Sequence, residues 1–232
     1  MTNEEKRMEA VRLMKSRAGR NTYTNSSRRK YFFGHPGEGD DGYSDCSSAV
    51  RECIRRASGI YIGSNTDAQI RNYKKGVLVE NTSNIFPDES LLRPGDCLYF
   101  KGNKNHVKQV GHVEMYTGPN ECWGHGSGTG PTRKDLRKYC ENRARNGRRY
   151  FCAIRWIPEE REPEKEITPE GHVYMTVREG VWPVRSRPAK SGGRTGTAKE
   201  GERVRVYGER DGWYGVRKAD GCKGYVEKAA FV

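Results

Sequence analysis

The spacing of apolar residues predicts helices in the N-terminal part of the chain. Residues 1–20, "MTNEEKRMEAVRLMKSRAGR", carry their apolar side chains on or near one face, as an amphipathic helix does. Residues 47–58, "SSAVRECIRRAS", show the same period, and Gly59 follows as a stop signal. We therefore expect two helices, the second of which begins close to Cys46.

Short apolar runs separated by turn residues follow these helices. The runs are "DCLYF" at 96–100, "HVEMYTG" at 112–118, "ECWGHGSG" at 121–128 and "FCAIRWI" at 151–157. Runs of this length and composition are typical of strands. Helices followed by a series of strands predict an α+β domain over residues 1–157.

The pattern changes after residue 157. Residues 158–169, "PEEREPEKEITP", are charged, bounded by prolines and free of aromatics, which indicates a linker. Residues 170–232 contain β-rich runs such as "ERVRVYGE" and "DGWYGVR", punctuated by glycine and Asp-Gly turns. About five such strands in so short a segment predict a small all-β barrel.

Composition excludes some classes of protein. The mean hydropathy is −0.99, and no apolar run is long enough to span a membrane. The net charge of +13 favours polyanionic surroundings, and arginine is dense at 26–31 and 142–151. These clusters lack interleaved aromatics and a recognisable binding module, so we expect solvated faces and no nucleic-acid partner. Residues 1–20 lack the features of a secretory signal, which predicts cytoplasmic synthesis without an export signal.

The seven cysteines do not indicate a disulfide framework. Their number is odd, their spacing matches no common scaffold, and we expect them to be mostly reduced. Cys53 and Cys97 lie in apolar segments and are predicted core residues. A zinc set of Cys122, His125, Cys140 and Cys152 matches no common finger spacing, so we predict no metal and no cofactor.

The cysteine at the start of the second helix is a candidate nucleophile. A thiol attacks as thiolate, which a helix N-terminus or a nearby imidazole stabilises. Asp45 or Ser47 could cap the helix that begins beside Cys46. His112 opens a strand after a glycine and could point at that helix end, and His125 could orient it from the neighbouring strand.

These residues lie in motifs that resemble a known family. "DCSSAV", "LLRPGDCLYF", "GHVEMYTG" and "CWGHGSG" are similar, in order, to the NlpC/p60-type papain-like cysteine peptidases of bacterial cell walls. The resemblance covers about residues 8–157. It implies that Cys46 is the nucleophile, that His112 is the general base and later protonates the leaving amine, and that His125 hydrogen-bonds and orients His112.

The resemblance also implies an oxyanion site and a substrate groove. "YFFGH" at 31–35 resembles the family's Y-x-x-G-G, so Tyr31 and the backbone N–H of Cys46 would stabilise the tetrahedral oxyanion. His35 replaces the second glycine and a longer insert follows, which leaves Tyr43 as a substitute for Tyr31. Asp45 and Ser47 would flank the acyl-binding groove.

Residues 173–232 resemble the bacterial SH3-like domains that accompany wall hydrolases, through "VRSRP", "GTAKEGERVRV", "GERDGWYGVR" and "GCKGYVEKAAFV". The resemblance implies that this module anchors the enzyme to peptidoglycan. Trp213 is a predicted core residue. The candidate wall contacts are Trp182, Tyr207, Tyr214 and Tyr225.

Together these features predict a two-domain, endolysin-like peptidoglycan hydrolase of bacteriophage type, acting at the cell wall. The resemblance favours cleavage between D-glutamate and a diamino acid, and anionic wall polymers are a further expected partner. Two alternatives stay open. One is another enzyme on the same fold, either an N-acetylmuramoyl-L-alanine amidase or an acyl transferase. The other is a catalytically inactive wall-binding protein.

Overall fold

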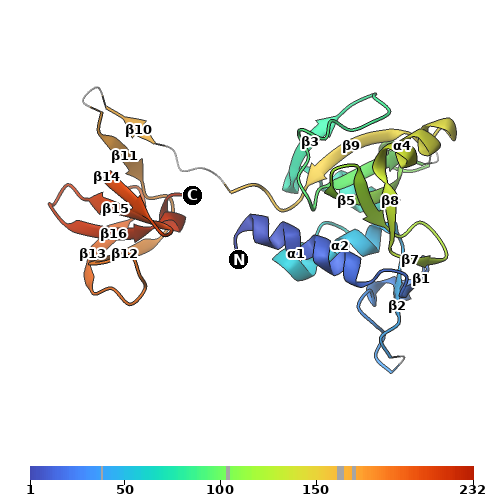
Figure 1. Cartoon of the computed structure of the whole chain (residues 1–232), viewed down its shortest axis with the longest axis horizontal. Helices are drawn as coiled ribbons and strands as arrows, with labels where there is room; N and C mark the ends of the chain where they lie inside the picture. The colour runs from blue at the N-terminus through green and yellow to red at the C-terminus, as the bar shows by residue number, and fades with distance from the viewer. Residues whose placement is uncertain (38, 103–104, 161–164, 169–170) are drawn as a thin grey trace. The chain divides into compact units, whose positions relative to one another are not determined.

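The computed structural model describes residues 1–37, 39–102, 105–160, 165–168 and 171–232. The chain divides into two compact units, Met1–Glu159 and Glu160–Val232. The first unit mixes helices and strands, and the second consists of strands with one short 3-10 helix in its described part (Figure 1). The predicted fold classes, α+β followed by all-β, are therefore confirmed.

Local signals in the sequence set the helix ends of the first unit. A capping box between Thr2 and Glu5 begins α1 (Asn3–Ser16). Asp45 caps α2 (Cys46–Ser58), and Gly59 ends it in the left-handed conformation, with φ of 78°. The remaining helices are α3 (Thr66–Arg71), α4 (Leu136–Arg145) and the short 3-10 helices η1 (Ser27–Lys30), η2 (Tyr73–Lys75) and η3 (Val107–Gln109).

An antiparallel sheet forms the centre of this unit. Its order is β3 (Val77–Asn81), β9 (Tyr150–Arg155), β4 (Cys97–Lys101), β5 (Val110–Gly118), β6 (Glu121–Gly124) and β8 (Thr132–Asp135). Helices α1 and α2 cover one face, whereas α4 lies on the other (Figure 1). Alternate residues of β4 serve the two cores: Tyr99 faces α1 and α2, and Phe100 faces α4.

A small second sheet brings the start of α2 close to a distant segment. Its order is β2 (Gly42–Ser44), β1 (Asn21–Tyr23) and β7 (Thr129–Gly130). Strands β1 and β2 are parallel, and the register aligns Tyr23 with Ser44. The chain therefore leaves this sheet after Tyr23 in an excursion and returns to it at Gly42, shortly before Cys46.

The second unit is one antiparallel sheet with an open strand order. Its strands are β10 (Glu166–Ile167), β11 (Val173–Thr176), β14 (Arg203–Arg210), β15 (Trp213–Arg217), β16 (Lys223–Glu227), β12 (Val181–Arg185) and β13 (Arg194–Lys199), in that spatial order, and the 3-10 helix η4 (Lys228–Phe231) follows β16. The pairings among the described residues do not close this sheet into the predicted barrel.

The linker prediction needs one correction. Part of residues 158–169 lies outside the described residues, but Glu166 and Ile167 form β10 and pair with β11. Arg203 holds this strand by a two-bond ion pair with the Glu166 carboxylate. No helix in the described part of the chain is both long and apolar enough to cross a membrane.

Candidate active site

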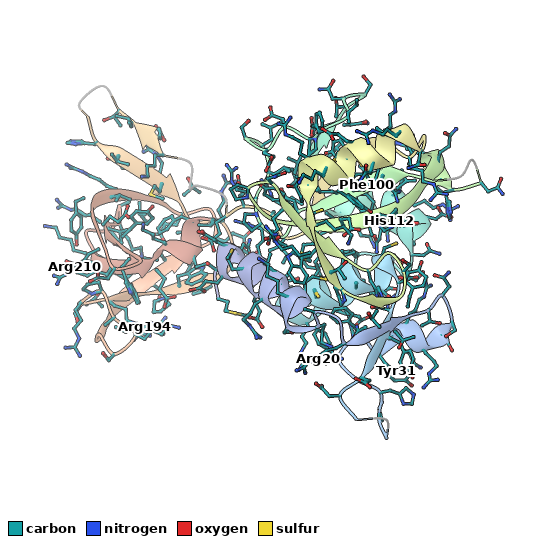
Figure 2. The ribbon with its side chains drawn as sticks, turned by 45° about the vertical axis from the view of Figure 1, so that its right-hand side comes forward. Arg20, Tyr31, Phe100, His112, Arg194 and Arg210 are labelled. Atoms are coloured by element: carbon teal, nitrogen blue, oxygen red, sulfur yellow. The ribbon has the colours of Figure 1, made fainter. Side chains whose placement is uncertain are left out.

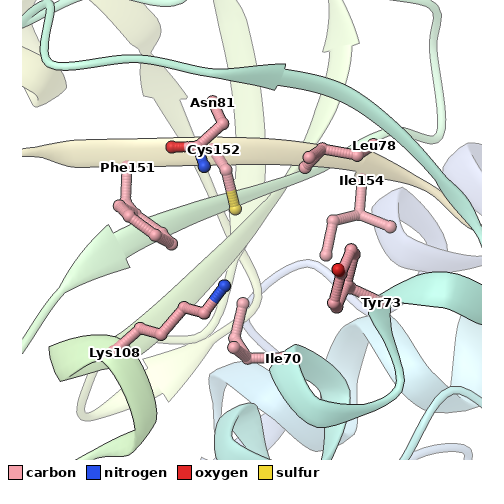
Figure 3. A pocket seen from close by; sticks show the side chains of 8 residues that line it. All are labelled: Ile70, Tyr73, Leu78, Asn81, Lys108, Phe151, Cys152 and Ile154. Atoms are coloured by element: carbon pink, nitrogen blue, oxygen red, sulfur yellow. The ribbon is translucent and has the colours of Figure 1, made fainter.

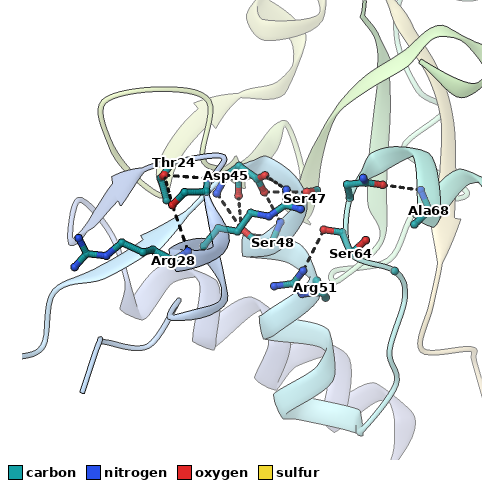
Figure 4. A network of polar contacts seen from close by, with 12 residues as sticks. Thr24, Arg28, Asp45, Ser47, Ser48, Arg51, Ser64 and Ala68 are labelled. Carbon is teal, nitrogen blue, oxygen red and sulfur yellow. Dashed lines mark hydrogen bonds and ion pairs between the residues drawn. The ribbon is translucent and has the colours of Figure 1, made fainter. Parts of the chain in front are cut away.

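Cys46 is the first residue of α2 and is almost fully buried. The Asp45 carboxylate accepts the backbone N–H of Ser48, and the Ser48 hydroxyl accepts the backbone N–H of Asp45 (Figure 4). This capping box pairs the backbone N–H groups of Asp45 and Ser48 and fixes the backbone on both sides of Cys46. The sulfur is therefore held at a helix N-terminus, where the helix dipole favours a negative charge.

Asp45 and Ser47 belong to the helix cap. The Ser47 hydroxyl donates to Asp45, and Arg29 forms an ion pair with the same carboxylate. Burial alone would raise the pKa of Asp45, but the Ser48 N–H and Arg29 outweigh it and lower that pKa. Ser47 is 2% exposed, and its carbonyl accepts from Gln69. Both residues thus position the nucleophile, and a role as walls of an acyl-binding groove stays a prediction.

His112 lies near the start of β5, close enough to Cys46 for the sulfur to raise the pKa of its imidazole. Burial alone would lower the pKa of His112. The adjacent Cys46 sulfur and the Glu114 carboxylate outweigh burial and raise this pKa to about 9. The structure therefore brings together the predicted nucleophile and the predicted base.

The partner of the far nitrogen of His112 is Glu114, and the prediction that His125 fills this place is wrong. Nε2 of His112 lies 2.6 Å from Oε1 of Glu114. Side chains at i and i+2 of a strand share a face, so the carboxylate comes from the same strand as the base. The signal was present in "HVEMY", where a glutamate follows two residues after the histidine.

A buried network holds the Glu114 carboxylate. Lys134 of β8 donates to Oε2 over 3.0 Å, and the Tyr139 hydroxyl of α4 donates to Oε1 over 3.1 Å and lies 2.9 Å from Nε2 of His112. Burial would raise the pKa of Glu114, but Lys134 and His112 lower it to about 2. The carboxylate therefore stays ionised although it is fully buried.

Gly124 makes room for this carboxylate. A Cβ atom at position 124 would lie 2.3 Å from Oε2 of Glu114. Any side chain at position 124 would collide with the Glu114 carboxylate, so the glycine of "CWGHG" is required there. The resemblance instead gave the functional role to its neighbour, His125.

His125 contacts the small sheet. Its Nδ1 lies 2.7 Å from the Ser44 hydroxyl, and its Nε2 lies 3.3 Å from the Gly128 carbonyl. Burial lowers the pKa of His125, so the neutral ring accepts from Ser44 and donates to Gly128. Its ring also packs edge-on against Tyr23, with centroids 5.2 Å apart. His125 therefore holds the Tyr23 ring in position.

Tyr23 is the tyrosine that the sequence reasoning missed. Burial raises the pKa of Tyr23, and Cys46 and Asp45 raise it further, so its hydroxyl lies within electrostatic reach of the nucleophile. The pairing of Tyr23 with Ser44 produces this proximity. Tyr31, which begins "YFFGH", meets the small sheet through its backbone, because its carbonyl accepts the N–H of Tyr43, while its ring packs on His35.

Tyr31 and Tyr43 have other neighbours. The Tyr31 ring packs on His35, with centroids 4.2 Å apart, and Figure 2 shows it on the projecting excursion, apart from His112. The Tyr43 ring stacks under the Arg28 guanidinium at 4.1 Å. The structure therefore does not support Tyr31 as the residue beside Cys46.

The other cysteines contrast with Cys46. All seven are free, and Cys53 and Cys97 are fully buried, as predicted. Burial raises the pKa of Cys53 well above its ordinary value. Among the described residues no group of histidine, cysteine and carboxylate side chains could hold a metal.

A separate pocket lies between α3, η2, η3, the edge strand β3 and its neighbour β9 (Figure 3). Cys152 points into it, and burial raises the pKa of this thiol to about 12. Its lining includes no predicted site residue; the lining residues are Ile70, Tyr73, Leu78, Asn81, Lys108, Phe151, Cys152 and Ile154.

The predicted wall contacts of the second unit differ in their exposure to solvent. Tyr214 is 2% exposed and packs edge-on against Phe231, so its assignment as a wall contact is wrong. Trp213 is buried, as predicted. Trp182 is half-buried against the core and donates to the Glu179 carbonyl.

Tyr207 is exposed in this unit, and Tyr225 is partly exposed. Tyr207 is 53% exposed, and its ring lies over Gly215, where a Cβ atom would come within 2.7 Å of it. Tyr225 pairs with the same glycine from the next strand. Residues 179–232, which contain this pair, match the family model described as bacterial SH3 domain. No curated protein matches the chain.

Several solved structures are similar to part of this chain. NlpC1 from Trichomonas vaginalis is 22% identical, with 66% of this chain and 44% of that chain covered and a TM-score of 0.47. The NlpC/p60 domain of peptidoglycan hydrolase SagA is 15% identical, with 64% and 97% covered and a TM-score of 0.42. The P60 domain of antigen MAP1204 from M. avium subspecies paratuberculosis is 20% identical, with 67% and 98% covered and a TM-score of 0.41.

The chain spans less than half the length of NlpC1 and of NlpC2 from Trichomonas vaginalis, of which 44% and 47% are covered. At these identities the likeness concerns the fold. The chemistry of the site is argued below from its own residues.

Proposed function

We propose that this protein is a peptidoglycan hydrolase whose first unit is a cysteine peptidase. The observation that carries the proposal is the buried series Cys46–His112–Glu114, in which a sulfur at a helix start contacts an imidazole held by a carboxylate. This is the arrangement of nucleophile, base and orienting group that acyl transfer requires. The order of the NlpC/p60-like motifs and the match to the bacterial SH3 domain family support a wall substrate.

In this mechanism the resting pair is a Cys46 thiolate and a His112 imidazolium. The thiolate attacks an amide carbonyl of the peptide stem and forms a tetrahedral intermediate. His112 then gives its proton to the departing amine, and a thioester remains on Cys46. Water, deprotonated by the now neutral His112, hydrolyses the thioester.

The oxyanion of this intermediate needs donors close to Cys46. The backbone N–H of Cys46 is one of the unpaired donors of the first helical turn, and the Tyr23 hydroxyl is the second in our proposal. One such donor is typically worth about 10²–10³ in rate. His125 positions Tyr23 through ring packing, and Ser44 and Gly128 hold His125.

The finer assignment follows the resemblance. We propose cleavage of the bond between D-glutamate and a diamino acid by an endolysin-like enzyme, with the Tyr207–Tyr225 surface of the second unit as the wall contact. An amidase would use the same three residues on a different amide bond, and an acyl transferase would pass the acyl group from the thioester to an acceptor other than water.

Digestion of purified cell walls tests this proposal. Wild type should clear a turbid wall suspension and Cys46→Ala should not. Mass spectrometry of the released muropeptides identifies the new termini and hence the bond. Clearing that is equal in wild type and Cys46→Ala would refute the proposed nucleophile, and no clearing by wild type would favour an inactive wall-binding protein.

A further inference from the structure

A polar pocket of about 470 Å³ lies along α4, and its lining residue Tyr139 contacts His112. Its lining residues occupy one stripe of the helix and the turn after it: Tyr139, Asn142, Arg143, Asn146 and Arg148. The volume falls in the range of ordinary ligand sites. We refer to it as the arginine pocket.

The charged side chains that line the arginine pocket are all positive. Two guanidinium groups and two carboxamides line it, and its lining has no carboxylate. Within the described part of the chain neither Arg143 nor Arg148 forms an ion pair with an acidic residue. By contrast, Arg145 on the same helix has a carboxylate partner, Glu141.

One donor in the pocket lacks an acceptor. Nε of Arg143 is buried and has no hydrogen-bond partner among the described residues, although Nη2 of the same side chain donates to the Lys101 carbonyl. A buried polar group without a partner is unfavourable. The guanidinium lies over the rings of Phe100 and Tyr139, which offer no hydrogen-bond acceptor of carboxylate strength and leave its positive charge without a counterion in the part of the chain that the structure describes. The carbonyls at the end of α4 do not oppose an anion strongly, because backbone N–H groups of Asn146, Gly147 and Arg148 already bond them.

The pocket adjoins the catalytic network through Tyr139. This side chain forms part of the pocket lining, and its hydroxyl contacts both His112 and Glu114. A group bound in the pocket therefore lies one side chain away from the base. We propose that the arginine pocket binds an anionic group, a carboxylate or a phosphate, of the wall polymer on which the enzyme acts.

The proposal that the pocket binds an anion does not depend on the proposed function. The assignment of that anion to a wall polymer does rest on the proposed function. Guanidinium and carboxamide donors fit the planar oxygens of a carboxylate and the tetrahedral oxygens of a phosphate. The carboxylate would come from the peptide stem and the phosphate from anionic polymers attached to the wall.

Titration of the full-length protein with inorganic phosphate and with acetate tests the binding. The side-chain amide signals of Asn142 and Asn146 in ¹⁵N NMR spectra report directly from the pocket. We expect saturable shifts that require about tenfold more anion in Arg148→Gln, the usual worth of a charged hydrogen bond. The matched control, Arg145→Gln, removes a cation from the same helix outside the pocket and should bind like wild type.

Equal dissociation constants for wild type and Arg148→Gln would overturn the proposal, and so would equal weakening in Arg145→Gln. The source of the anion follows from kcat/KM on walls with and without their phosphate-bearing polymers. A defect of Arg148→Gln on intact walls alone assigns the phosphate, and a defect on both substrates assigns the stem carboxylate. No defect on either overturns the substrate assignment, whereas a wild type that cleaves neither wall refutes the proposed function and leaves the binding result intact.

Discussion

The imidazole of His112 and the carboxylate of Glu114 are joined by a 2.6 Å contact between Nε2 and Oε1. The two residues are neighbours on one face of β5, so a single strand supplies both the base and the group that orients it. Lys134 and Tyr139, from β8 and α4, complete this buried arrangement. The relationship leads to specific expectations for variants and for pH.

Replacement of Glu114 by glutamine should lower kcat/KM by about 10²–10⁴, because the amide removes the charge that stabilises the imidazolium. Assays of wall clearing at constant pH measure the loss. Glu121→Gln is the matched control on the neighbouring strand, since its carboxylate bonds Arg133 and Lys15 and does not contact His112. Wild-type activity in Glu114→Gln would contradict the assigned role.

The activity should fall at alkaline pH, with a midpoint near 9. The pKa of His112 in the folded protein is raised to about 9, so the imidazolium is lost as pH rises through 9, and the stability that it contributes is complete below its ordinary pKa of about 6.5. The free energy of unfolding that the His112–Glu114 ion pair contributes should be lost between about pH 6.5 and 9. In Glu114→Gln the alkaline limb of the kcat/KM profile should move to lower pH, and an unmoved limb would show that His112 does not set it.

Cys46→Ala should abolish hydrolysis, whereas Cys53→Ala should remain active. Both residues lie on α2, but Cys53 is fully buried in mid-helix and its thiol pKa is raised by burial. Loss of its sulfur should cost about 1 kcal/mol of unfolding free energy through a small cavity. Thermal unfolding and wall clearing, measured on the same preparations, separate the two effects; inactivation of well-folded Cys53→Ala would argue against this division of roles.

Tyr23→Phe should lower kcat by about 10²–10³, because the variant removes one oxyanion donor and keeps the ring that packs on His125. Tyr31→Phe removes the same hydroxyl from a ring that packs on His35 and should change kcat little. A larger loss in Tyr31→Phe than in Tyr23→Phe would reverse the assignment.

In the second unit, Tyr214→Ala should lower the unfolding free energy by about 3–5 kcal/mol, since the ring is buried against Phe231. Tyr207→Ala should leave stability nearly unchanged and weaken retention on sedimented walls, because its ring is exposed beside Tyr225. Wall retention by Tyr207→Ala equal to wild type would exclude this face as the contact.

The sequence by itself determined the features that depend on residues close to one another along the chain. The start of α2 at Cys46 follows from a cap between residues three apart, and its end follows from a glycine that adopts positive φ. The division into α+β and all-β parts follows from apolar spacing, which reports which face of an element is buried. His112 was identified because a strand that begins with histidine could point at this helix end.

Only the tertiary structure decided which distant groups complete the site. Tyr23 comes within electrostatic range of Cys46 because parallel pairing of β1 with β2 aligns it with Ser44, and the sequence of neither strand indicates that register. Glu114 replaced His125 as the partner of His112 because Gly124 leaves space for a buried carboxylate and Lys134 neutralises it. Packing likewise buried Tyr214 and exposed Tyr207, although both lie in similar strands, since the side of a sheet that faces the core depends on long-range contacts.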